Sequence, residues 1–182
     1  MVHDPNLLDK LDAFPKEGFS GTVFRATRQS LDPLTSSFSG GHCMTPGTVG
    51  VLYISLLREG ALAEISFHWS QLDPLPTKAV VVHSLKVVAH HTLKLLRADL
   101  TALGISEATF GTSKLSRAQE IGAAVEFLGC DGLIAPSARW PCENLILFPD
   151  RMSVNVVLEI HSSEPVDWIQ WASDHSILKT GS

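Results

Sequence analysis

The chain has 182 residues, of which 45% are hydrophobic, and it carries a formal net charge of −5 at pH 7. This length and hydrophobic content suit one domain that buries its own core without the help of metals or disulfides. The acidic balance argues against sequence-independent binding to nucleic acid or to an anionic membrane surface, so we expect neither kind of partner.

The first third of the chain predicts a helix, a strand and a long loop. Residues 6–14 place three leucines on one side of a short helix, which ends before Pro15. Residues 21–27 alternate between two faces, as a strand does, and include Arg25. Residues 29–48 are rich in Ser, Pro, Thr and Gly, and a loop of about 20 residues in a compact domain is usually functional or disordered.

The middle of the chain predicts a strand, a helix and a segment that can be interpreted in two ways. Residues 49–56 are strongly apolar and predict a buried strand that carries Tyr53. Residues 59–69 predict an amphipathic helix, with Glu64 beside its apolar stripe. Residues 78–96 are rich in valine but interrupted by histidine and lysine, and they predict either two strands or a strand followed by a turn.

The last part of the chain mixes helices and strands without a regular period. Residues 95–103 predict a short helix ended by Gly104, and a longer helix opens at Ser113 or Ser116 and runs to Gly129. Three strands and a closing helix follow, at residues 132–135, 144–148, 154–160 and 168–175. Because the strands are interleaved with few helices and show no β-α-β repeat, we predict an α+β fold.

Two of these strands carry small polar side chains at their ends. Strand 132–135 runs into Pro136, whose fixed backbone directs Ser137 out of the strand at a defined angle. The next strand begins at Asn144. Strand ends that bear small polar groups commonly form the floor of a site for a polar ligand. The alternative is a strand, a loop and a strand whose polar residues are incidental.

Cysteine, histidine and hydropathy patterns bear on compartment and metals. Cys43, Cys130 and Cys142 lack the close spacing of a zinc knuckle or a redox dithiol, so we expect reduced thiols in a cytoplasm. The first residues lack the basic-then-apolar order of a signal peptide, and no apolar run approaches the roughly 18 to 20 residues that cross a bilayer. The histidines match no zinc motif, so we expect no metal.

Three polar residues stand where solvation alone does not explain them: Arg25 in a strand, Tyr53 in an otherwise aliphatic strand and Glu64 beside an apolar stripe. An arginine fork suits pyrophosphate oxygens, and an aromatic ring stacks on a nicotinamide or a base. A carboxylate holds a ribose hydroxyl and opposes the positive charge that grows on the sugar as a glycosidic bond breaks. Together they favour a dinucleotide ligand. Singly, each has a structural explanation: an edge-strand arginine, a core tyrosine and a solvent-facing glutamate.

Short motifs follow one another in a fixed order along residues 19–149. They are Val23-Phe24-Arg25-Ala26, Asp32-Pro33-Leu34, the pair Gly40-Gly41 ahead of Pro46-Gly47, Val51-Leu52-Tyr53-Ile54-Ser55, Gly60-Ala61-Leu62-Ala63-Glu64, Gln119-Glu120-Ile121-Gly122 and the block 132–148. This order resembles the RES domain, the toxin half of the RES–Xre toxin–antitoxin systems. The resemblance implies a fold like that of the ADP-ribosyltransferases, NAD as substrate, and growth arrest through loss of NAD or modification of a target.

The same resemblance implies a set of site residues. By position they are Arg25, Tyr53 and Glu64 in catalysis, with Ser137 and Asn144 at the substrate. One departure concerns the segment before the tyrosine strand, where a second arginine is expected and this chain has His42. Histidine still donates a hydrogen bond to a ribose or phosphate oxygen, but a permanently charged fork is lost.

Domain organisation and partners are also implied by the resemblance. Residues 1–18 are expected to form an N-terminal helical extension, residues 19–160 the RES-like catalytic domain, and residues 161–182 a C-terminal helix and tail packed on the same domain. An Xre-type antitoxin with a helix-turn-helix region is expected to block the site. Association of the chain with itself or with that antitoxin is left open.

Three functions stay open at this point. The first is cleavage of the nicotinamide–ribose bond of NAD with water or phosphate as acceptor: Tyr53 stacks near the nicotinamide ribose, Arg25 grips the pyrophosphate and Glu64 stabilises the cationic transition state. Substrate orientation then falls to His42, Ser137 and Asn144. The second is mono-ADP-ribosylation of a protein, although Leu62 stands where arginine-modifying transferases carry another acidic residue. The third is a catalytically impaired member that binds a nucleotide without turnover.

Overall fold

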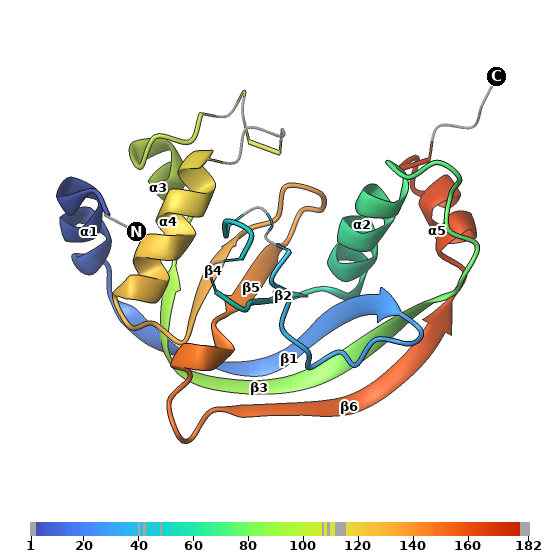
Figure 1. Ribbon diagram of the computed structural model, residues 1–182, viewed down its shortest axis with the longest axis horizontal. Helices are drawn as coiled ribbons and strands as arrows, with labels where there is room; N and C mark the ends of the chain where they lie inside the picture. The colour runs from blue at the N-terminus through green and yellow to red at the C-terminus, as the bar shows by residue number, and fades with distance from the viewer. Residues whose placement is uncertain are drawn as a thin grey trace.

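A strongly bent sheet forms the frame of the molecule, and the helices lie in separate groups toward its two ends (Figure 1). The computed structural model describes residues 3–39, 41, 43–47, 49–106, 108, 110–111 and 116–178. In chain order its elements are α1 (Pro5–Asp12), β1 (Lys16–Arg28), β2 (Leu52–Ser55), α2 (Arg58–Trp69), β3 (Val80–Lys94), α3 (Arg97–Ala102), α4 (Ser116–Phe127), β4 (Gly132–Pro136), β5 (Glu143–Leu147), the 3-10 helix η1 (Pro149–Arg151), β6 (Val157–Val166) and α5 (Trp168–Asp174).

Strand β3 organises the sheet because both of its edges are paired. One edge pairs with β1, antiparallel, along nearly its whole length. The other edge pairs with β6 over residues 80–88 and, further along, in parallel with β4 at residues 92–94. Strand β4 then pairs with β5, β5 with β2, and β2 returns to β1 where Phe24 lies opposite Ser55. In the described part of the chain, β1, β2, β5, β4 and β3 therefore close into a barrel, which β6 extends on one side.

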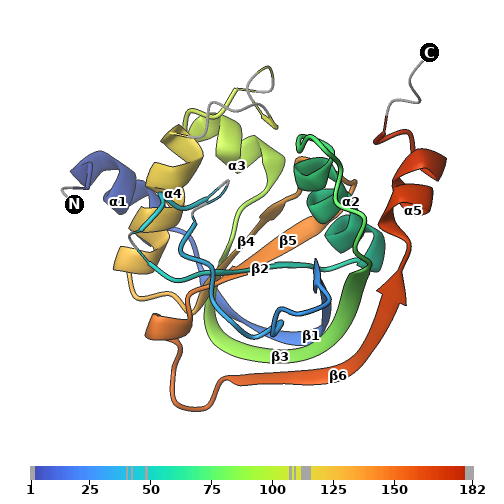
Figure 2. The same ribbon diagram turned by 45° about the vertical axis from the view of Figure 1, so that its right-hand side comes forward.

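The buried side chains of the described residues gather in one cluster inside the barrel and two outside it. The interior is aliphatic and includes Val23, Leu85 and Leu145. One outer cluster packs α1, α3 and α4 against β2, β4 and β5, and it contains Phe148. The other packs α2 and α5 against β1 and β3 around Trp168. Figures 1 and 2 show these two helix groups on either side of β2, β4 and β5, whose outer face lies between them.

The structure confirms the α+β fold and most of the predicted elements, with shifted ends. Strand β1 begins earlier than predicted, at Lys16, and β6 runs to Val166. Gly104 and Gly129, at φ of 96° and 77°, follow α3 and α4 as predicted for helix C-termini. None of the helices in the described ranges has the length and apolarity to cross a bilayer.

The prediction for residues 78–96 was wrong, because β3 is one continuous strand of 15 residues. Its polar residues do not interrupt it. His83 is buried, and its ring hydrogen-bonds with Thr27 on β1 at 3.0 Å and with Ser163 on β6 at 2.7 Å. Lys86 lies on the exposed face. A strand between two partners can thus bury a histidine that a single-sequence pattern treats as a break.

Candidate active site

Glu64 is positioned by the close approach of α2 to the strands beneath it. A Cβ atom at Gly60 would collide with Ser55 Oγ and would lie 2.6 Å from Cys142 Sγ. A side chain at residue 60 would therefore push the helix outward, and Glu64, one turn later, would move with it. The absence of a side chain at this position lets α2 deliver a carboxylate to the ends of β4 and β5.

The Glu64 carboxylate is held through one of its two oxygens. Ser137 Oγ donates to Glu64 Oε1 at 2.9 Å, and Asn144 Nδ2 donates to the same oxygen at 2.8 Å. Ser137 Oγ in turn accepts from the backbone N–H groups of Arg139 at 3.1 Å and Trp140 at 3.3 Å, which orients its own hydrogen toward Glu64. Oxygen Oε2 receives no hydrogen bond from the described residues. The structure thus brings together the predicted residues Glu64, Ser137 and Asn144.

Two polar atoms beside Glu64 are buried without a partner among the described residues: Tyr53 Oη and Asn144 Oδ1. Burial raises the pKa of Tyr53 well above its usual range, and the Cys43 thiol and the Glu64 carboxylate raise it further. The backbone N–H groups of Cys43 and Met44 lie near Tyr53 Oη and lower its pKa in part, but neither forms a hydrogen bond with it. The phenol is therefore neutral at physiological pH and retains a free donor. Unsatisfied buried groups are rare in native proteins, and a ligand that pairs with them explains them.

The loop before β2 is clamped over Tyr53 from two sides. A Cβ at Gly41 would lie 2.7 Å from the Tyr53 ring, so the backbone there rests directly on the phenol. From α4, Gln119 Nε2 donates to the Gly41 carbonyl at 3.0 Å, and Gly122 leaves room for the Cys43 carbonyl, which a Cβ would strike. His42 lies outside the described residues. The motif Gln119–Gly122 is explained by this contact between α4 and the loop.

Arg25 has a different surrounding from the one predicted. Strand alternation puts it on the same face of β1 as Val23, which lies inside the barrel, whereas Tyr53 faces outward with the α4-side cluster. Its guanidinium donates to the carbonyls of Pro33 at 2.6 Å and Thr35 at 3.1 Å. Burial lowers the pKa of Arg25, and Asp32 opposes that change. The structure places no hydrogen bond or ion pair between Arg25 and Glu64.

Arg139 is the guanidinium that the structure does place near Glu64, and it was missed at the sequence level. Its central carbon lies 3.4 Å from the ring centroid of Phe67, which follows Glu64 by three residues on α2. Burial lowers the pKa of Arg139, and the charge of Glu64 opposes that change. The one available signal was position, because Arg139 follows Ser137 by two residues.

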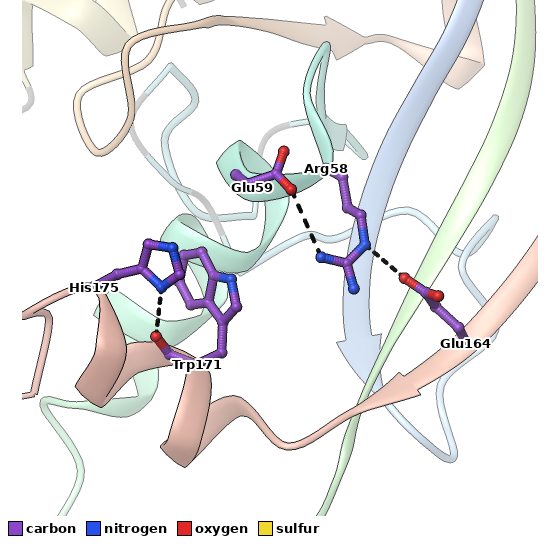
Figure 3. A network of polar contacts seen from close by, with 5 residues as sticks. All are labelled: Arg58, Glu59, Glu164, Trp171 and His175. Carbon is purple, nitrogen blue, oxygen red and sulfur yellow. Dashed lines mark hydrogen bonds and ion pairs between the residues drawn. The ribbon is translucent and has the colours of Figure 1, made fainter.

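Helix α2 is also fixed at its first residue, and α5 packs against the segment that follows Ser137. Arg58 Nε donates to Glu164 of β6 at 2.6 Å, and its Nη1 lies 3.7 Å from Glu59 (Figure 3). On α5, the rings of Trp171 and His175 stack at 4.2 Å, and His175 Nδ1 donates to the Trp171 carbonyl (Figure 3). Trp140, in the segment after Ser137, packs against both rings, at 5.8 Å from Trp171 and 5.5 Å from His175. Helix α5 thus supports the same segment that holds Glu64.

Thiols and metal ligands contribute little to this region. Burial raises the pKa of Cys43 to about 12 and raises that of Cys130 and Cys142, so these free thiols are poor nucleophiles. Among the described residues, no three His, Cys, Asp or Glu side chains are grouped so as to hold a metal ion.

Comparison with known proteins agrees with this architecture. Residues 22–169 match a family model described as the RES domain. A search of curated proteins gave no match. Among solved structures, a chain of the M. tuberculosis MbcT–MbcA toxin–antitoxin complex has a similar fold, with a TM-score of 0.80 and 18% sequence identity. The match covers 93% of this chain and 97% of that chain.

Proposed function

The chain belongs to the RES domain family, and on that premise we propose that it is the toxin of a toxin–antitoxin pair and that it breaks the nicotinamide–ribose bond of NAD. The observation that supports this chemistry best is the Glu64 carboxylate, which two neutral donors hold by one oxygen while the other oxygen stays open. A fixed anion of this kind stabilises a cation that develops beside it, at no cost of reorganisation.

In the proposed reaction the bond between the ribose anomeric carbon and the nicotinamide nitrogen breaks, and its electron pair leaves with the nicotinamide. The anomeric carbon and the ring oxygen share the resulting positive charge, which Glu64 Oε2 stabilises. Water or phosphate then forms a bond to that carbon. With water the products are ADP-ribose, nicotinamide and a released proton; with phosphate they are a phosphorylated ADP-ribose and nicotinamide.

The unpartnered atoms beside Glu64 suit a sugar. Tyr53 Oη offers a donor and Asn144 Oδ1 an acceptor, and a ribose hydroxyl is able to pair with either. We assign Ser137 and Asn144 the additional task of positioning Glu64. In this proposal Arg25 holds the loop at Pro33 and Thr35 rather than the pyrophosphate, and His42 keeps its expected role at the substrate.

The acceptor is proposed to be water or phosphate rather than an arginine of a protein. Leu62, two residues before Glu64, is fully buried in the cluster that packs α2 against β1 and β3. The helix therefore presents no second carboxylate at the position that arginine-modifying transferases use. Transfer to another kind of protein side chain remains the second candidate, which the product analysis below separates.

The partner in this proposal is an Xre-type antitoxin that covers the Glu64 site. The similar fold of a chain in a toxin–antitoxin complex supports such a partner. The proposed place of action is the cytoplasm, where NAD and the antitoxin are both present. The bent sheet is proposed to be a variant of the ADP-ribosyltransferase fold.

The test is to incubate the purified protein with NAD, with and without phosphate, and to resolve the products by mass spectrometry. We expect free nicotinamide in both conditions, ADP-ribose without phosphate and its phosphorylated form with phosphate. Nicotinamide release that requires a protein acceptor, together with a mass increase on that protein, would favour the transferase instead. Binding of NAD with no release at all would favour the impaired member.

A matched pair of variants tests the role of Glu64. In Glu64→Gln the amide oxygen still accepts from Ser137 and Asn144, so the fold is kept while the charge is lost. We expect nicotinamide release to fall on the order of 10³-fold. Glu59→Gln makes the same change on the same helix at a partly exposed position and should leave release unchanged. Full release by Glu64→Gln would remove Glu64 from the mechanism.

A further inference from the structure

Arg139 stands out because its guanidinium lies against an aromatic ring but has no hydrogen-bond or ion-pair partner among the described residues. The side chain is half-buried, and its guanidinium makes no hydrogen bond or ion pair with any residue that the structure describes. Buried or half-buried arginines normally pair with carboxylates or carbonyls, as Arg25 does with Pro33 and Thr35. Five N–H donors on Arg139 therefore remain available.

The position of this guanidinium is fixed by its neighbours. Its central carbon lies over the ring of Phe67 of α2, 3.4 Å from the ring centroid, and the backbone N–H of Arg139 donates to Ser137 Oγ. A Cβ at Gly111 would lie 3.6 Å from Nη1, so Gly111, between α3 and α4, lies near the guanidinium at ordinary contact distance. Stacking on an aromatic ring holds a guanidinium in one plane and leaves its edge free for hydrogen bonds.

The surroundings of Arg139 indicate the charge of the missing partner. Glu64 acts on Arg139 through its charge but is not within ion-pair distance, so the two groups are neighbours without neutralising each other by contact. A planar fork with two parallel N–H groups matches the oxygens of a phosphate. An anion beside Glu64 also requires a cation to offset the repulsion between the two negative charges.

We propose that Arg139 is a phosphate-binding residue of the Glu64 site, which takes a phosphate or diphosphate group through its unpartnered guanidinium edge. This inference rests on the proposed function for the identity of the whole substrate. In a dinucleotide, the ribose that carries the nicotinamide is joined through its 5′ carbon to the diphosphate, so groups that bind the two parts must be neighbours. Glu64 and Arg139 meet that requirement. The same fork would suit inorganic phosphate as the acceptor.

The test is calorimetric titration of the 182-residue chain with inorganic pyrophosphate and, separately, with inorganic phosphate. We expect Arg139→Met to bind pyrophosphate roughly 10- to 100-fold more weakly than the unsubstituted protein, since each hydrogen bond to a charged group is lost with the fork. Arg139→Lys should fall between the two, because it keeps the charge and loses the bidentate geometry. Arg97→Met is the matched control: Arg97 also stacks on an aromatic ring, Phe110, at 3.8 Å, but is exposed on α3.

Kinetics separate the two sources of phosphate. If the diphosphate of NAD is the partner, Arg139→Met raises KM for NAD in phosphate-free buffer. If the acceptor is the partner, KM for NAD stays constant and the phosphate concentration for half-maximal product rises instead. The inference would be overturned if Arg139→Met bound each anion as tightly as the unsubstituted protein does. It would also be overturned if the unsubstituted protein bound neither anion. Because the titration needs no turnover, a protein that binds pyrophosphate through Arg139 but does not cleave NAD would overturn the proposed function alone.

Discussion

Two polar regions on opposite faces of the sheet differ in how completely their hydrogen bonds are satisfied. In the Arg25 region, Arg25 donates to the carbonyls of Pro33 and Thr35, and His83 lies between Thr27 and Ser163. In the Glu64 region, Tyr53 Oη and Asn144 Oδ1 have no partner in the described structure. The first region uses its polar groups to hold the protein together.

The Glu64 region contains well-ordered hydrogen bonds, but some of its buried polar groups have no partner among the described residues. The Ser137 hydroxyl is fully hydrogen-bonded: it donates to Glu64 and accepts from two backbone N–H groups. Among the described residues, Glu64 Oε2, Tyr53 Oη, Asn144 Oδ1 and the Arg139 guanidinium make no hydrogen bond, and the charge of Glu64 acts on both Tyr53 and Arg139. The comparison indicates that a ligand binds where buried polar groups lack hydrogen-bond partners. The burial of a charged residue is not by itself such a sign. The following predictions test that distinction, from the largest expected effect to the smallest.

The largest effect is expected on catalysis, when both donors to Glu64 are removed. The double variant Ser137→Ala with Asn144→Leu leaves the carboxylate unoriented, and we expect kcat for nicotinamide release to fall about 10²- to 10³-fold, as for loss of an oriented charge-stabilising group. Ser137→Thr alone should retain most of the rate, since it keeps the hydroxyl. Ser66→Ala is the control on α2, because the buried Ser66 hydroxyl makes no hydrogen bond with the described residues. A double variant as fast as the control would mean that Glu64 needs no positioning.

A stability effect is expected in the Arg25 region. Arg25→Met leaves the carbonyls of Pro33 and Thr35 without their charged donor, and we expect the free energy of unfolding in urea to fall by about 2–3 kcal/mol. The KM for NAD should change less than in Arg139→Met. Arg28→Met, at an exposed position of the same strand, provides the baseline. A large rise in the KM for NAD with an unchanged free energy of unfolding in Arg25→Met would indicate that Arg25 binds the substrate instead.

The contact between α4 and the loop over Tyr53 links packing to the site. A Cβ in Gly122→Ala would strike the Cys43 carbonyl, so we expect a loss of about 1–3 kcal/mol in unfolding free energy, as in other overpacked positions. Displacement of the loop should also change the fluorescence of Tyr53 relative to Gly18→Ala, where a Cβ would meet the nearest atom at an ordinary 3.5 Å. Equal stability of the two variants would show that the loop adjusts freely.

The smallest effect is expected from His83 and depends on pH. Burial lowers the pKa of His83 from its usual 6.5, and Arg25 lowers it further, so the unfolded chain takes up a proton more readily than the folded one. The contribution of His83 to the free energy of unfolding is therefore fully present above about pH 6.5. It declines as the pH falls toward the lower pKa of His83 in the folded protein. The loss of urea resistance between pH 7.5 and pH 5.5 should be smaller in His83→Gln than in His68→Gln, an exposed control. Identical slopes would contradict the assignment.

Local patterns were enough to find much of the Glu64 region. Ser137 and Asn144 were predicted because a proline and an apolar run define the ends of two strands, and Glu64 because it lies beside the apolar stripe of a helix. The helices and most strands were predicted from the same periodicities. These features depend on residues close together in the chain, which is what such patterns report.

The remainder depends on contacts between distant segments. The partners of Arg25 are carbonyls in an irregular loop, which no periodicity describes. His83 looked like an interruption of β3 until its partners on two flanking strands were known. Arg139 follows Ser137 by two residues, but its guanidinium is positioned by Phe67, which lies on another element. The sequence pattern does not show that contact.

The most direct measurement of the central claim is a crystal structure of Glu64→Gln with NAD bound. Our account predicts that the nicotinamide ribose lies against residue 64 with its hydroxyls paired to Tyr53 and Asn144, and that a phosphate of NAD contacts Arg139, while Arg25 still binds Pro33 and Thr35. NAD bound elsewhere, or an Arg25 guanidinium that leaves the loop to take the diphosphate, would contradict it.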